Sequence, residues 1–196
     1  MRILKVSLVG WKKNDLGEIA ACLRAGGVIA YPTDTIYGLG CLATEESAIK
    51  RIYRLKKRAR LKPLLVLLSG WRRLNKYVYL RRAQLDYLRT IWPGPVTAVF
   101  ESKNILPRIL TVGQTALAVR WPAEKFLCAL LRRLPAPLVS TSLNISGQPA
   151  LGINGLEKIF KRRSLDLAVD AGPLPPRPPS RIIDVRDLRV IRLIRE

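Results

Sequence analysis

The sequence predicts an α/β fold, in which one domain spanning residues 1–196 forms a mixed β-sheet flanked by helices around a basic cavity. Short apolar runs alternate along the chain with longer segments of helical periodicity. Hydrophobic residues make up 48% of the sequence, which is enough for one sizeable core at this length. Several apolar runs follow one another without a helix between them, near residues 96–121 and at the C-terminus, so we expect antiparallel pairs in the sheet.

Helices are expected where apolar residues recur three or four positions apart and capping residues mark the ends. The first is predicted over residues 14–27, between a capping Asn-Asp pair and a glycine pair. The second is predicted over residues 44–58, with Thr44 as its N-cap and two glutamates in its first turn, where carboxylates suit the helix dipole. The remaining predicted helices are 82–92, 123–134 and 154–163.

Strands are expected at the short apolar runs between these helices. The predicted strands are the first ten residues, 28–32, 63–69, 97–102, 115–121, 137–142, 165–172, 180–187 and 189–194. The proline-rich segment 171–181 (AGPLPPRPPSR) is predicted to be a stiff surface loop that leads into the last strands.

Composition excludes several classes of chemistry. The chain has no histidine, and its three cysteines contain no Cys-x-x-Cys pair, so we expect no zinc site and no metal-binding side-chain cluster. Without histidine, Ser–His and Cys–His nucleophiles are excluded too. No apolar run approaches the roughly 18–20 residues that cross a bilayer, and the N-terminus is a poor signal peptide. Isolated cysteines fit a reducing, cytoplasmic setting.

Charge indicates an anionic partner. The chain has 35 Lys and Arg against 14 Asp and Glu, a net charge of +21. Such an excess repels itself unless RNA, a membrane surface or nucleotide phosphates lie nearby. Between Arg51 and Arg89 the chain has 13 basic residues and a single acid, Asp86. A solvated basic surface would have the same composition, so charge alone names no partner.

Polar, glycine-rich segments recur at the ends of the predicted strands. They are 31–40 (YPTDTIYGLG), 56–64 (KKRARLKPL), 92–97 (WPGPVT), 112–122 (VGQTALAVRWP) and 140–149 (STSLNISGQP). Ligands in α/β proteins usually lie beyond strand ends, in loops that the sheet holds in place. Hydroxyls from the first and last segments and cations from the second predict a pocket for an anionic ligand with further polar groups. Neither a phosphate loop nor a G-x-G-x-x-G turn is present.

Structural alternatives stay open for these residues taken one at a time. Lys56 and Arg58 could clamp phosphates, or simply complement the dipole at a helix end. The Ser-Thr-Ser-x-Asn run could bind a ligand or only form a turn. Arg120 lies in an apolar strand, where its guanidinium must reach either an anion or the sheet edge.

Six segments together resemble the YrdC/TsaC family of threonylcarbamoyl-AMP synthases, in the same order and at similar spacing. They are YPTDTIYGLG, LKKRARLKPL, WPGPVT, LAVRWP, STSLNISGQP and PSRIID, and the resemblance runs from about residue 14 to the C-terminus. It implies a twisted α/β sheet around a deep, positively charged cavity. It also implies a nucleotidyltransferase that joins L-threonine, bicarbonate and ATP into threonylcarbamoyl-AMP. A partner transferase would then pass the threonylcarbamoyl group to an adenosine of tRNA.

The resemblance also implies site residues. It implies catalytic roles for Lys56 and Arg58 toward the phosphates and the bicarbonate-derived carboxylate. The residues it assigns to threonine are Thr35, Arg120, Ser140 and Ser180. The residues it assigns to ATP are Arg58, Lys62, Thr115, Ser142, Asn144 and Arg195. Mg²⁺ is expected to accompany ATP, with no protein metal ligand. Within the first motif, Gly38 and Gly40 are expected to allow a close backbone turn, and Asp34 is either a turn-forming carboxylate or a helper to the metal.

Three positions depart from the family pattern. Leu143 replaces an alanine, Arg181 replaces a threonine, and Ala59 stands where a proline is usual. These departures leave two alternatives to a synthase. One is a basic RNA-binding protein without synthase activity, and the other is a paralogue with a different carbamoyl or adenylate chemistry.

Overall fold

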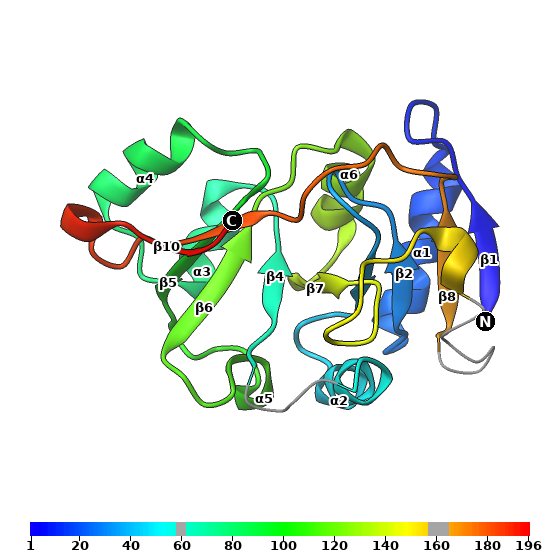
Figure 1. The fold of residues 1–196 in the computed structure, drawn as a ribbon, viewed down its shortest axis with the longest axis horizontal. Helices are drawn as coiled ribbons and strands as arrows, with labels where there is room; N and C mark the ends of the chain where they lie inside the picture. Colours follow the sequence, from blue (N-terminus) through cyan, green and yellow to red (C-terminus); the bar gives the residue numbers. More distant parts are fainter. Residues whose placement is uncertain (58–61, 157–164) are drawn as a thin grey trace.

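The computed structural model describes residues 1–57, 62–156 and 165–196, and these contain ten strands in one sheet (Figure 1). The sheet order is β1-β8-β2-β3-β7-β4-β6-β5-β9-β10. The strands are β1 (Arg2–Lys5), β2 (Ile29–Tyr31), β3 (Gly38–Gly40), β4 (Leu65–Leu67), β5 (Val96–Glu101), β6 (Ala116–Arg120), β7 (Leu138–Ser142), β8 (Leu167–Asp170), β9 (Arg181–Asp184) and β10 (Arg192–Arg195). Parallel pairs such as β1–β8 and antiparallel pairs such as β3–β7 occur together, so the predicted mixed sheet is confirmed.

Six α-helices and two short 3₁₀ turns accompany the sheet in these residues. They are α1 (Lys13–Arg24), α2 (Glu46–Leu55), α3 (Trp71–Tyr77), α4 (Arg82–Arg89), α5 (Arg108–Thr111), α6 (Lys125–Arg133), η1 (Ile153–Gly155) and η2 (Leu188–Val190). The sequence predicted the regions of α1, α2, α4 and α6 but missed the short helices α3 and α5. Most of the helix predicted over 154–163 lies outside the described residues. No helix of the described segments has the length and apolarity needed to cross a membrane.

The start of α2 differs from the prediction. Glu45, not Thr44, is the N-cap, and it makes no side-chain capping bond. The Thr44 hydroxyl instead donates to the Glu45 carboxylate at 3.2 Å. A local side-chain contact between these neighbours has therefore replaced the expected cap.

Two hydrophobic clusters lie on opposite faces of the sheet. Neighbouring strand residues fall alternately into one cluster or the other: Ile29 and Tyr31 pack with α1 and α6, whereas Ala30 packs with α2. Leu67 of β4 packs on the face that α1 and α6 cover. Other strand residues whose side chains point to this same face line the cavity described below. The cavity therefore lies on the side of the sheet that α1 and α6 cover.

The segment 31–40 is a β-hairpin rather than a plain turn. β2 and β3 pair antiparallel, with Tyr31 opposite Gly38, and β3 in turn pairs with β7. The expectation that Gly38 and Gly40 allow a backbone turn is wrong, because both lie within β3 and neither has a positive φ. Glycine is needed at position 40 for another reason: a Cβ there would lie 2.5 Å from the carbonyl oxygen of Val139 and 2.7 Å from the Tyr31 ring.

Candidate functional site

A cavity of about 1070 Å³ opens between the hairpin loop, strands β4, β6 and β7, and the proline-rich segment before β9. Most of the predicted site residues line it, although they come from distant parts of the chain. The predicted residues among its lining are Thr35, Thr115, Arg120, Ser140, Ser142, Asn144, Ser180 and Arg195. Lys56 and Lys62 are not in this lining. Arg58, predicted to be catalytic, lies outside the described residues.

Thr33 organises the hairpin loop. Its Oγ1 accepts hydrogen bonds from the backbone N–H groups of Thr35 (3.1 Å) and Ile36 (3.2 Å). The same hydroxyl donates to the Ile36 carbonyl at 2.7 Å. A threonine that bonds to nearby backbone groups stabilises a tight turn. The loop therefore presents Thr35 at the cavity wall in a fixed position.

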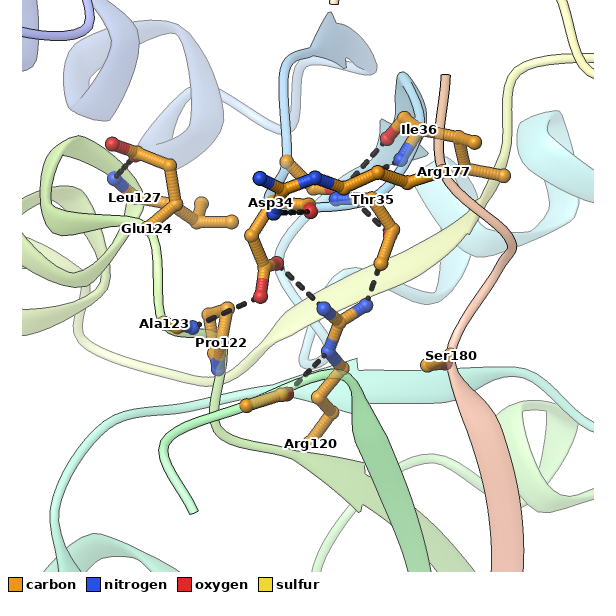
Figure 2. Close-up of polar contacts among 12 residues, drawn as sticks. Asp34, Thr35, Ile36, Arg120, Pro122, Ala123, Glu124, Leu127, Arg177 and Ser180 are labelled. Atoms are coloured by element: carbon orange, nitrogen blue, oxygen red, sulfur yellow. Dashed lines mark hydrogen bonds and ion pairs between the residues drawn. The ribbon is translucent and has the colours of Figure 1, made fainter. Parts of the chain in front are cut away.

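Arg120, at the end of β6, joins this loop to the sheet (Figure 2). Its Nη2 donates to Asp34 Oδ1 at 2.6 Å and its Nη1 to Thr35 Oγ1 at 3.2 Å. Its Nε donates to the carbonyl of Gly94 at 3.1 Å. The two charged side chains are 6% and 9% exposed, so this is a buried ion pair. The sequence predicted that the Arg120 guanidinium must reach either an anion or the sheet edge. The anion that it reaches is the Asp34 carboxylate of the hairpin loop.

Burial opposes the charge on Arg120. Desolvation lowers the pKa of its guanidinium from the ordinary value, and the nearby Asp34 carboxylate raises it again. The other oxygen of Asp34 accepts the backbone N–H of Ala123 at 3.1 Å. Both carboxylate oxygens of Asp34 thus bond outside the hairpin loop, so Asp34 does more than form a turn, and its help to a metal stays a prediction. It is the counter-ion that holds Arg120.

Tyr31 places Ser140 at the cavity wall. Its phenol donates to Ser140 Oγ at 2.7 Å. Full burial raises the pKa of Tyr31 well above the ordinary value of 10, so the phenol stays protonated and remains a donor near neutral pH. The antiparallel pairing of β3 and β7 sets Gly38 opposite Ser142. Two segments about a hundred residues apart in sequence are in this way combined into one wall.

Strands β5 and β10 hold Ser180 at the cavity wall. Ser180 Oγ lies 2.9 Å from Thr97 Oγ1, with either hydroxyl able to donate. Arg195 of β10 donates to the Ser180 carbonyl at 2.7 Å. Because Ser180 and Ile182 both line the cavity, the alternation of the strand turns the exposed Arg181 to the other face. This departure from the family pattern therefore does not enter the cavity.

Lys56 is 1% exposed, and its amine binds the loop that follows β7. Nζ donates to the carbonyls of Ser142 (2.5 Å) and Asn144 (3.0 Å), and to Asn144 Oδ1 (2.5 Å). Ser142 Oγ also donates to Asn144 Oδ1, at 2.7 Å. Lys56 thus fixes two predicted ATP-binding side chains in place, while its own role toward phosphate stays a prediction. Leu143, between them, is fully buried in the core and is absent from the cavity lining.

Sequence reasoning missed several residues of this site. It gave Asp34 as a turn former or a helper to the metal and did not connect it with Arg120, although a buried arginine requires a counter-ion. It read Arg177 as part of a surface loop, yet Arg177 lines the cavity. It also missed Asp184, which lines the cavity beside Arg186. Hydrogen bonds from Arg186 lower the pKa of the Asp184 carboxyl below its ordinary value of 3.8.

A family model for the Sua5/YciO/YrdC domain, described as "Telomere recombination", matches residues 21–196. The chain is 40% identical over 174 residues to the threonylcarbamoyl-AMP synthase of Thiobacillus denitrificans, covering 88% of this chain and 92% of the relative. It is 34% identical over 165 residues to the protein of that name from Psychromonas ingrahamii, covering 82% and 86% respectively.

Solved structures resemble the fold. A double variant of Pyrococcus abyssi Sua5 superposes with a TM-score of 0.91 at 28% identity, over 100% of this chain and 57% of that one. P. abyssi Sua5 in complex with L-threonine gives a TM-score of 0.87 at 29% identity, over 94% and 54%. The chain therefore spans little more than half of these Sua5 chains. Escherichia coli YciO, at 23% identity and a TM-score of 0.86, shares the fold over 100% of this chain and 94% of its own.

Proposed function

The chain belongs to the Sua5/YciO/YrdC family, and on this premise we propose that it is an L-threonylcarbamoyladenylate synthase. The enzyme would form threonylcarbamoyl-AMP and pyrophosphate from L-threonine, bicarbonate and ATP. The product would serve a cytoplasmic threonylcarbamoyl transferase that modifies tRNA. The observation that carries the proposal is that one cavity is lined both by Arg120 with the hydroxyls of Thr35 and Ser180 and by the Ser-x-Ser-x-Asn loop that Lys56 braces.

Threonine is assigned to the end formed by Thr35, Arg120 and Ser180. A carboxylate can reach the N–H groups of Arg120 that do not donate to Asp34, Thr35 or Gly94. The hydroxyls of Thr35 and Ser180 can exchange hydrogen bonds with the substrate's polar groups. The L-threonine bound to P. abyssi Sua5 supports threonine as the amino acid. Ser140, which Tyr31 positions, is assigned to the same substrate.

ATP is assigned to the loop after β7 together with Thr115 and Arg195, which line the same cavity. Lys56, Arg58 and Lys62 are proposed to act on the phosphates and on the bicarbonate-derived carboxylate. Mg²⁺ would enter as part of the nucleotide substrate, since this ion commonly binds mainly to substrate phosphates.

The reaction brings anions together, which decides what the residues must do. Threonine's amine forms a bond to the carbon of bicarbonate, and water leaves, which gives a carbamate. The carboxylate oxygen of this carbamate then attacks the α-phosphorus while the bond to pyrophosphate breaks. The protein must align these groups and neutralise charge at phosphorus. Cations and hydroxyls suffice for that, so the lack of histidine fits the reaction.

Pyrophosphate release tests the proposal directly. Purified protein with Mg²⁺-ATP, bicarbonate and L-threonine should release pyrophosphate and form threonylcarbamoyl-AMP, detected by mass. Omitting threonine or bicarbonate should each remove the signal. Release no greater than in the no-threonine control would reject a synthase.

One observation favours a second candidate: the net charge of +21 suits an RNA-binding protein without synthase activity. RNA binding that weakens steeply with salt, without ATP turnover, would support that candidate. A paralogue with different chemistry would turn over ATP with another amino acid in place of threonine. The same assay with a panel of amino acids separates these cases.

A further inference from the structure

The proline-rich segment 171–180, here called the strap, links β8 to β9 past the threonine end of the cavity. Its first residues are held by Tyr37, whose phenol donates to the Gly172 carbonyl at 2.7 Å and accepts the Ala171 N–H at 3.0 Å. Its last residue, Ser180, is held by Thr97. Prolines restrict the backbone between these ends. The strap is therefore a stiff segment fixed at both ends.

Arg177 extends from the strap across the hairpin loop (Figure 2). Its Nη1 donates to the backbone carbonyl of Asp34 at 3.2 Å. The residue as a whole is exposed, and its side chain is part of the cavity lining. Across residues 1–57, 62–156 and 165–196, no carboxylate forms an ion pair with it. Among these residues its positive charge therefore has no carboxylate partner. The Arg177 side chain lies near Arg120, the arginine that is assigned to threonine (Figure 2).

Arg120 by itself is a poor receptor for an anion. Its charge is already matched by Asp34 at 2.6 Å, and three of its five N–H groups are engaged. A substrate carboxylate that reached the remaining N–H groups would also approach the negative charge of Asp34. Like charges at such short range repel strongly in a partly buried site. A second cation at this place would remove the penalty.

We propose that Arg177 is a substrate-binding residue, which contacts the carboxylate of the amino-acid substrate together with Arg120. The assignment rests on the proposed function, which puts threonine at this end of the cavity. The bond to the Asp34 carbonyl holds the Arg177 guanidinium beside the ion pair until the substrate arrives. A planar fork at this position can bind a carboxylate through two N–H groups.

Steady-state kinetics of Arg177→Ala test this assignment. The KM for L-threonine should rise about tenfold, the effect of one lost charge-assisted hydrogen bond, while the KM for ATP changes less than about twofold. Arg177→Lys keeps the charge without the fork and should recover part of the loss. Arg82→Ala is the matched control, because Arg82 is an exposed arginine on α4 away from the cavity lining. It should leave both constants unchanged.

A substrate analogue identifies the group that is contacted. L-threoninamide has no carboxylate, so wild-type protein should use or bind it much more weakly than L-threonine. In Arg177→Ala the preference for L-threonine over L-threoninamide should shrink by about tenfold, because the contact that distinguishes the carboxylate from the amide is lost. An unchanged preference, or a rise in the KM for ATP alone, would overturn the proposal. Equal losses for both substrates together with a lower Tm would also overturn it, because they indicate a purely structural clasp.

Failure of the proposed function can be distinguished from failure of this inference. If wild-type protein releases no pyrophosphate, the function fails, and binding of L-threonine is measured directly by calorimetry instead. Weaker threonine binding to Arg177→Ala than to wild type would still support the contact. Equal binding to both proteins would refute it.

Discussion

At the residue scale, the cavity depends on charged side chains that other side chains hold in place. Asp34 holds Arg120, and Lys56 holds the backbone of the loop after β7. Both contacts are buried, so the groups involved have lost hydration that only their partners replace. Removing one partner should therefore cost more than the contact itself contributes.

Asp34→Asn tests this at the ion pair. The substitution keeps the shape but leaves the buried Arg120 charge without its counter-ion, so unfolding free energy should fall by about 3–5 kcal/mol. Urea unfolding measures the loss. Asp86→Asn is the control, because Asp86 pairs with Arg82 and Arg89 at the surface and should cost less than about 1 kcal/mol. Equal effects of the two variants would contradict the role given to Asp34.

Lys56→Met tests the brace of the loop. Methionine has a similar length but donates no hydrogen bond, so carbonyls of Ser142 and Asn144 would lose their partner. We expect a loss of about 2–4 kcal/mol in stability and weaker ATP binding. Calorimetry with ATP and chemical denaturation provide the two readouts. Lys50→Met, at an exposed ion pair with Glu46, should change neither by more than a small amount.

At the scale of elements, the β2–β3 hairpin joins the two hydrophobic faces and the cavity. Gly40 lets the hairpin lie against the Tyr31 ring and the backbone of Val139. The same Tyr31 donates to Ser140 at the cavity wall. Packing of the hairpin and geometry of the site are therefore linked through one side chain.

Gly40→Ala should lower stability by about 1–3 kcal/mol, because the new methyl group would overlap backbone that cannot move freely. Thermal unfolding checks this. Gly17→Ala is the matched control: Gly17 lies within α1 with open space where its Cβ would be. There alanine should stabilise by about 1 kcal/mol through helix propensity. Destabilisation at both positions would show that the close contact at Gly40 is not the cause.

The sequence predicted the long elements well and the short ones poorly, for physical reasons. Periodicity identifies α1 and α6 because four or more apolar residues of each helix face the sheet. β3 was missed because it consists of Gly-Leu-Gly, and strand propensity cannot reveal glycines that are required by a neighbouring ring. Predicted site residues such as Thr35 and Asn144 do meet at one cavity. The Asp34–Arg120 pair and the position of Arg177 depend on contacts 86 and 143 residues apart, which local patterns do not encode.

At the scale of the whole molecule, the net charge of +21 acts against the compact state. Eight ion pairs occur among the described residues, and most of them lie at the surface, so self-repulsion between the remaining cations persists. Dissolved salt or a bound polyanion would reduce it.

Raising sodium chloride from 20 to 300 mM should therefore raise Tm by about 2–4 °C, as the Debye length falls below the spacing of surface charges. Differential scanning fluorimetry measures the shift. Sodium sulfate at equal ionic strength is the control. General screening should raise Tm equally in both salts, whereas binding of a specific anion should make the two shifts in Tm differ. A Tm that falls with added chloride would contradict net repulsion as the dominant effect.

The Asp34 carboxylate joins three parts of the chain: the hairpin loop, the end of β6, and the segment that leads into α6 through the amide of Ala123. That amide is consequently a natural spectroscopic probe of the site. Its hydrogen exchanges with solvent when the hydrogen bond to Asp34 breaks, so its exchange rate reports how often this bond beside Arg120 breaks. Slower exchange of this single amide when L-threonine is added would follow substrate binding without a label, a variant or a chemical reaction.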